Sequence, residues 1–337
     1  MKAHSKSIGK YSGLLFVMFC LTACHSIIAS QITKPLTPVF SKLSEEETRF
    51  FGEFFRYCDS NKKCLDLFLR QAQEVDTERT IKLSLIQGTE KKVFNVDLNE
   101  TNRYSSEPGK LIVIFPGFGI DSRVYSGTLA PWLNHLSGND VLVAPAANQN
   151  ANFNFGLDSA SLIAEYIKKS AYKKVSVLSF SMGAVAAIHL ASLTEVERNV
   201  MIAPMQDFPL ALKTVGGMQY PKLSKFLNDD DYISIANEVI LNSKVDANTL
   251  DLRSRLQQYQ VQDTRRVHLF ASRGDRISPF QYWKPLAETS VCLKQTNKLN
   301  HTHLMALMDE DLRNEVLLLM RAPLRRNECI AESDVAI

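Results

Sequence analysis

The chain has 337 residues, of which 45% are hydrophobic and 22% charged, and its formal net charge at pH 7 is +3. This composition is typical of a folded globular protein, and the length suits one large domain with an insertion. No run of Lys and Arg has the length or the interleaved aromatic residues that indicate a nucleic-acid partner.

The first 23 residues are typical of a secretory signal peptide. Three lysines precede an apolar run over residues 13–23, which is too short to span a bilayer. The run ends in Leu-Thr-Ala followed by Cys24, which resembles the bacterial lipobox. The resemblance implies a lipid on Cys24, a membrane attachment through it and, with no Asp after the cysteine, an outer-membrane location facing the periplasm. A simple signal peptide and an uncleaved anchor stay open as alternatives.

Export removes Lys2, Lys6 and Lys10, so the mature chain has a net charge of about zero. It also places the cysteines in an oxidising compartment, where an even number of them predicts disulfides. Four cysteines remain beyond the lipobox, namely Cys58, Cys64, Cys292 and Cys329. They can pair in three ways, and all three stay open. Pairing Cys58 with Cys64 would close a short polar loop, and Cys292 with Cys329 would tie the last strand to the tail. The spacings fit a zinc site poorly.

Residues 24–40 are expected to form a tether, because Pro35 and Pro38 interrupt regular structure. Over residues 41–78 apolar side chains recur at helical spacing, which predicts two helices joined at the cysteine loop. A β-hairpin should follow, with strands over residues 80–85 and 92–98 and a turn near Gly88.

From residue 110 onward strands and helices alternate, which predicts a mostly parallel sheet with helices on both faces. The expected strands are 110–115, 140–144, 174–178, 199–202, 266–271 and 290–295, and clear helices are 158–170 and 184–193. A polar, helix-rich stretch interrupts the pattern at about 205–262 and is read as an inserted cap. The predicted domain therefore covers residues 79–325, followed by a tail over 326–337.

A five-residue motif from Ser179 to Gly183 joins the strand at 174–178 to the helix at 184–193. A serine on such a sharp turn has a strained backbone, an exposed hydroxyl and the N–H groups of the helix N-terminus beside it. We therefore expect Ser181 to be a nucleophile. Ser179 stands where glycine is usual, and it is small enough for that position.

A serine nucleophile needs a histidine base and an acid that orients the histidine. Asp275 follows the strand at 266–271, just past its carboxyl end, and is the expected acid. His301 and His303 follow the next strand, and we favour His303 as the base because an apolar residue stands four positions after it. His189 and His268 lie inside a helix and a strand, where a structural role is expected.

Oxyanion donors are expected from backbone N–H groups after the nucleophile and after the first parallel strand. The second position is a Pro-Gly-Phe-Gly loop at residues 116–119. Met182 and Phe118 are therefore assigned as the donors.

Together these motifs, in this order, resemble the α/β-hydrolase superfamily over residues 80–320. The resemblance implies a central sheet of about eight strands and a serine hydrolase that cleaves an ester, thioester or amide without a metal or other cofactor. The substrate would be a small-molecule or lipid-like acyl compound, and the cap and the loop at residues 148–153 should shape its pocket. The alternative is a non-catalytic lipoprotein that uses the same fold as a binding module. The oligomeric state is left open.

Overall fold

The computed structural model describes residues 25–34, 50–72, 79–87, 90–99, 108–258, 267–289, 291–296 and 309–321. The signal segment, Cys24, Cys329, His301, His303 and the tail at 326–337 lie outside the described residues. None of the helices within the described ranges is long and apolar enough to cross a membrane.

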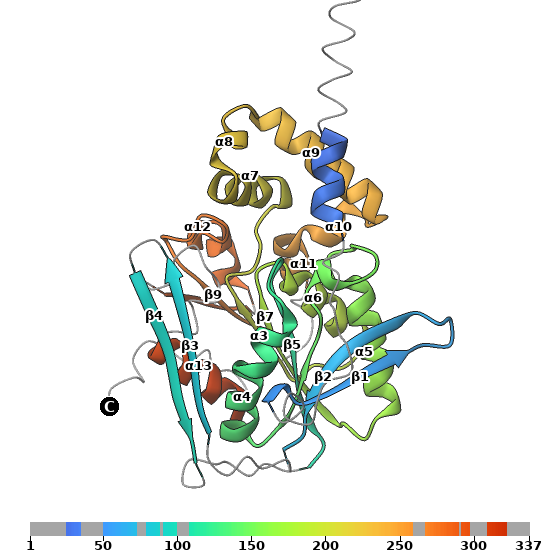
Figure 1. The fold of residues 1–337 in the computed structure, drawn as a ribbon, viewed down its shortest axis with the longest axis vertical. Coiled ribbons are helices and arrows are strands. Elements are labelled where there is room, and N and C mark those ends of the chain that lie inside the picture. The colour runs from blue at the N-terminus through green and yellow to red at the C-terminus, as the bar shows by residue number, and fades with distance from the viewer. Residues whose placement is uncertain are drawn as a thin grey trace, which may run out of the picture.

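An eight-stranded sheet forms the centre of the molecule, with strand order β1-β2-β6-β5-β7-β8-β9-β10 (Figure 1). The six strands from β6 to β10 in this order pair in parallel, and β1 and β2 pair antiparallel at one edge. The strands are β1 (Glu53–Cys58), β2 (Cys64–Arg70), β5 (Lys110–Phe115), β6 (Asp140–Val143), β7 (Lys174–Phe180), β8 (Arg198–Ile202), β9 (Val267–Ala271) and β10 (Cys292–Gln295). The predicted parallel sheet of about eight strands is therefore confirmed.

Helices cover both faces of this sheet, because alternate side chains of each buried strand point to opposite sides. On β5, Ile112 and Ile114 belong to a core shared with α3, α4 and α13, whereas Leu111 and Val113 belong to a core shared with α5 and α6. These helices are α3 (Ser122–Gly127), α4 (Leu129–Ser137), α5 (Leu157–Lys169), α6 (Gly183–Leu193) and α13 (Glu310–Arg321). Short helices η2 (Ala147–Gln149), α12 (Phe280–Trp283) and η4 (Lys284–Glu288) complete the loops.

The predicted helices at 41–78 are wrong where the structure describes this segment, because β1 and β2 form a hairpin that joins the central sheet. Phe68 packs into one core layer, and Leu67 and Leu69 pack into the other. A strand buried on both faces reads as a short apolar run, which periodicity does not separate from a helix. The Cys58–Cys64 disulfide closes the hairpin, as the sequence suggested. Cys292 is also disulfide-bonded.

The second predicted hairpin is confirmed as β3 (Arg79–Gln87) and β4 (Glu90–Leu98), which form a separate two-stranded sheet. Ile81 and Leu98 attach it to the core that contains α4 and α13. The eight strands of the central sheet therefore include the cysteine hairpin rather than this one.

A helical insertion lies between β8 and β9, where the sequence predicts a cap, and its first helices lie beyond one end of the sheet (Figure 1). It consists of α7 (Phe208–Gln219), α8 (Pro221–Ser224), α9 (Asp229–Ser243), α10 (Ala247–Leu250) and α11 (Leu252–Gln258). Residues 25–33 form another helix beside α9, shown in dark blue in Figure 1. The expected tether is therefore wrong for these residues. Pro35 and Pro38 follow the helix and do not prevent it.

Candidate active site

Ser181 lies on the turn between β7 and α6, with a positive φ of 49°. A positive φ is rare for a residue with a side chain and signals a strained backbone, as expected for an exposed nucleophile. Its backbone N–H donates to the carbonyl of Ile202 at 3.2 Å, and its own carbonyl accepts from Met205 N–H at 3.1 Å. The end of β8 and the loop after it therefore hold the strained turn through both of its backbone polar groups.

Two glycines explain how the chain makes this turn. A Cβ on Gly183 would lie 2.4 Å from the carbonyl oxygen of Phe115, so only glycine lets the first turn of α6 pack against the end of β5. A Cβ on Gly117 would lie 3.4 Å from the Cβ of Ser181, so the loop after β5 runs directly beside the serine. Ser179 is fully buried, and its hydroxyl donates a weak 3.5 Å hydrogen bond to the carbonyl of Val200. The fold thus accommodates serine where glycine is usual.

The loop after β5 presents the second expected oxyanion donor. The N–H of Gly119 is occupied, because it donates to Oδ1 of the buried Asn148 at 3.1 Å. Within the residues that the structure describes, the N–H groups of Phe118 and Met182 have no hydrogen-bond acceptor. Phe118 also stacks edge-on against Phe153, with ring centroids 5.9 Å apart. Phe118 and Met182 line the same cavity as Ser181.

Asp275 follows β9 at the same edge of the sheet, and its carboxyl group is 1% exposed. Its Oδ1 accepts the N–H groups of Ile277 at 2.8 Å and Ser278 at 3.0 Å. Two such bonds fix the orientation of a carboxylate. Asp275 therefore lies past the carboxyl end of β9, where the sequence places it.

The loop after β8 connects the Asp275 turn to the serine turn. Gln206 donates its backbone N–H to Ile277 O at 3.4 Å and its side-chain Nε2 to Arg276 O at 3.0 Å. Because the neighbouring Met205 binds the carbonyl of Ser181, one short segment holds both turns. Sequence reasoning did not identify this connection.

His189 and His268, for which the sequence predicts a structural role, both lie within regular elements of the fold. His268 on β9 is 7% exposed, and its pKa falls to about 4, mainly because of burial and secondly because of Arg198. His189 on α6 lies 3.1 Å from the hydroxyl of Ser161, and burial lowers its pKa as well. The expected base, His303, and its alternative, His301, lie outside the described residues. Among the residues that the structure covers, no three His, Cys, Asp or Glu side chains group as metal ligands.

Ser181 opens into a cavity of about 500 Å³. Its walls come from the serine turn, the Phe118 loop, the helical insertion and the helix at residues 25–33. Most of the lining side chains are hydrocarbon, among them Met205, Phe208, Leu212, Val215 and Ile235. A volume of this size is typical of small-molecule sites. The insertion expected as a cap thus contributes to the pocket of Ser181, as predicted.

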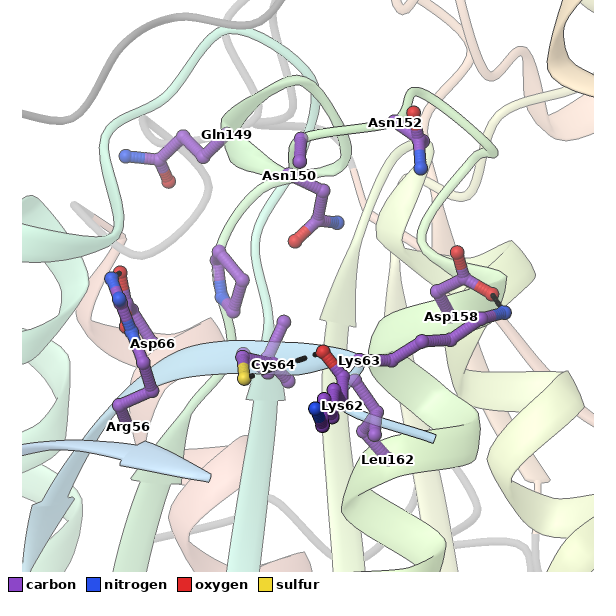
Figure 2. A pocket seen from close by; sticks show the side chains of 13 residues that line it. Arg56, Lys62, Lys63, Cys64, Asp66, Gln149, Asn150, Asn152, Asp158 and Leu162 are labelled. Carbon is purple, nitrogen blue, oxygen red and sulfur yellow. Dashed lines mark hydrogen bonds and ion pairs between the residues drawn. The ribbon is translucent and has the colours of Figure 1, made fainter. Parts of the chain in front are cut away.

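A second cavity of about 600 Å³ lies beside β2 and the loop that follows β6 (Figure 2). Four of its five charged side chains form ion pairs, Arg56 with Asp66 at 2.7 Å and Lys63 with Asp158 at 3.4 Å, and Lys62 is the fifth. Asn150 and Asn152 line this cavity and not the one at Ser181. The 148–153 loop therefore contributes no side chain to the wall of the Ser181 cavity. Its two ends act on that cavity indirectly, because Asn148 and Phe153 contact the loop that carries Phe118.

The sequence matches no protein family and no curated protein. The structure is similar to two crystal forms of the Pyrococcus furiosus esterase Pf2001, with TM-scores of 0.54 and 0.52 and 14% sequence identity in each case. These matches cover 86% and 85% of this chain and 97% and 98% of the esterase. At this level of identity the similarity concerns the fold, which is the α/β-hydrolase fold.

Proposed function

We propose that the chain is a serine hydrolase that cleaves an ester, thioester or amide through an acyl-enzyme. The observation that carries the proposal is the strained Ser181, with a φ of 49°, in the wall of a largely apolar cavity of about 500 Å³. A strained backbone persists only where the surrounding structure holds it, and such residues cluster at functional sites. That the structurally similar Pf2001 protein is an esterase supports the same chemistry.

The proposed reaction begins when Ser181 Oγ attacks the carbonyl carbon of the substrate and gives its proton to His303. Asp275 orients the imidazole, and its rigid carboxylate supports this role. The N–H groups of Phe118 and Met182 hold the oxyanion of the tetrahedral intermediate, after which His303 protonates the leaving group. Water, activated by the same histidine, then hydrolyses the acyl-enzyme.

We further propose that a lipid on Cys24 attaches the enzyme to the outer membrane, facing the periplasm. The sequence motif supports the lipid, and the Cys58–Cys64 disulfide fits an oxidising compartment. Labelling cells with radioactive palmitate tests the lipid. The label should enter the wild-type chain and be lost in Cys24→Ser, and an unlabelled wild type would overturn the attachment.

The hydrolase proposal is tested by labelling with a fluorescent fluorophosphonate, which reacts with activated serines. Wild type should label, and Ser181→Ala and His303→Ala should not. Ser179→Gly and His301→Ala are the matched controls and should keep the label. A folded wild type that fails to label would overturn the hydrolase proposal and favour the alternative, a non-catalytic binding module. Loss of the label in His301→Ala alone would reassign the base.

A further inference from the structure

The helix at residues 25–33 lies against the cavity of Ser181, although about 150 residues separate the two in sequence. The helix contributes Ile27, Ile28, Gln31 and Ile32 to the cavity wall. These positions are one and four residues apart, so they form a single face of a helix. Ser30 lies on the other side and is exposed. One face of this helix is therefore committed to the cavity.

Two contacts hold the helix in this position. Ala29 is fully buried, in the same core as Met205, Ile235 and Ala236. His25 bonds through Nε2 to Asp231 Oδ1 at 3.0 Å, and both side chains are mostly buried.

Asp231 is itself fixed, because it exchanges hydrogen bonds of 2.8 and 3.0 Å with Asn228 at the start of α9. The helix at residues 25–33 is therefore attached to a rigid helix terminus. The helix at residues 25–33 therefore packs on the insertion as an ordered element.

The chemistry of the cavity indicates what it accepts. Its polar lining residues are few beside the hydrocarbon side chains: Gln31, Ser181, Tyr220, Ser224 and Tyr232. A cavity with the reactive serine at one wall and hydrocarbon elsewhere suits an acyl group whose chain extends away from the carbonyl. Ile28 and Ile32 of the helix at residues 25–33 are among these hydrocarbon side chains.

We infer, on the basis of the proposed hydrolase function, that residues 25–33 form part of the substrate site, and that Ile28 and Ile32 set the length of straight acyl chain that Ser181 processes. Each methylene buried in the cavity should raise kcat/KM by up to about fourfold until the chain reaches this wall. The segment next to the expected lipid attachment is thus a specificity element of the enzyme.

The first test uses p-nitrophenyl acetate, octanoate and dodecanoate with the full chain. Wild type should prefer the longer esters. Ile32→Trp should lower kcat/KM for dodecanoate by about tenfold or more while acetate changes little, because the indole occupies the far part of the cavity. Ser30→Trp places the same side chain on the solvent side and should keep the wild-type profile. Equal losses on all three esters, the same effect from Ser30→Trp, or a wild type that prefers acetate would overturn the inference.

A second readout does not need catalysis. Ser181→Ala should bind 11-(dansylamino)undecanoic acid with a rise in fluorescence, and adding Ile32→Trp should abolish the rise while adding Ser30→Trp should not. If the probe binds in this way but the wild type fails to label with fluorophosphonate, residues 25–33 do form part of the binding site and the hydrolase proposal is wrong. If Ser181 labels but the probe does not bind, the hydrolase proposal stands and the inferred role of residues 25–33 is wrong.

Discussion

The side-chain oxygen of Asn148 accepts the N–H of Gly119 at 3.1 Å, and this bond ties the loop after β6 to the loop that carries Phe118. Asn148 touches no part of the serine cavity, yet it fixes the backbone beside one of the two proposed oxyanion donors. If Phe118 is a donor, we expect Asn148 to be a positioning residue that stabilises the transition state more than it stabilises bound substrate.

Asn148→Ala should lower kcat by about tenfold and leave KM nearly unchanged, less than the 10²–10³-fold loss typical of removing a donor. Steady-state kinetics with a p-nitrophenyl ester measure both constants. Asn150→Ala is the matched control, because Asn150 bonds to Ser159 and lines the second cavity. A rise in KM with kcat unchanged would contradict the positioning role.

Gly183→Ala should destabilise the fold by about 1–3 kcal/mol, since the added methyl would meet the carbonyl oxygens of Phe115 and Pro116 at 2.4 and 2.6 Å. Gly217→Ala in α7 is the control, because its nearest neighbour, Ser224 Oγ, is 3.6 Å from the added methyl. That substitution should stabilise by about 0.5–1 kcal/mol, as expected for alanine in a helix. Urea unfolding measures both, and equal effects would refute the steric argument.

The stability of the protein should fall as the pH is lowered from about 6.5 to 4 because of His268. In the folded state the pKa of His268 is about 4, lowered by burial and by Arg198, so the unfolded chain binds a proton first. This group alone should cost up to about 3 kcal/mol across the window. Urea unfolding at a series of pH values should show a flatter profile for His268→Gln, and an unchanged slope would contradict the assignment.

Replacing both cysteines of the β1–β2 hairpin by serine should lower the free energy of unfolding by about 2 kcal/mol. The Cys58–Cys64 bond closes a short loop, with a sequence separation of six, so the entropy it removes from the unfolded chain is small. Neither cysteine lines the serine cavity, and ester hydrolysis should be unaffected. An unchanged urea midpoint, or a loss of activity without a loss of stability, would argue against this account.

The elements around Ser181 were predictable because their signals are local. β5, β7 and β9 are largely buried and rich in apolar residues, and the small residues around the serine turn identify its geometry. Asp275 could be placed because parallel strands present their carboxyl ends at one edge.

The walls of the site could not be predicted, since they depend on packing between distant segments. The helix at residues 25–33 follows an apolar signal-like run and precedes two prolines, which favoured a tether. Its only signal was the spacing of Ile27, Ile28 and Ile32, too short a pattern to establish a helix by itself. The hairpin of β1 and β2 was missed because β2 joins the sheet through β6, which is about 70 residues away in sequence.

The hairpin of β1 and β2 also bears on aggregation, because it forms one edge of the central sheet. β1 is the last strand of the sheet on its side, and unpaired backbone groups of an edge strand invite other chains to add to it. Here Glu53 and Arg56 expose charged side chains on that strand, and the disulfide holds it to β2. Charged edge residues of this kind discourage strand-to-strand pairing between molecules, so the hairpin protects this edge of the sheet against aggregation.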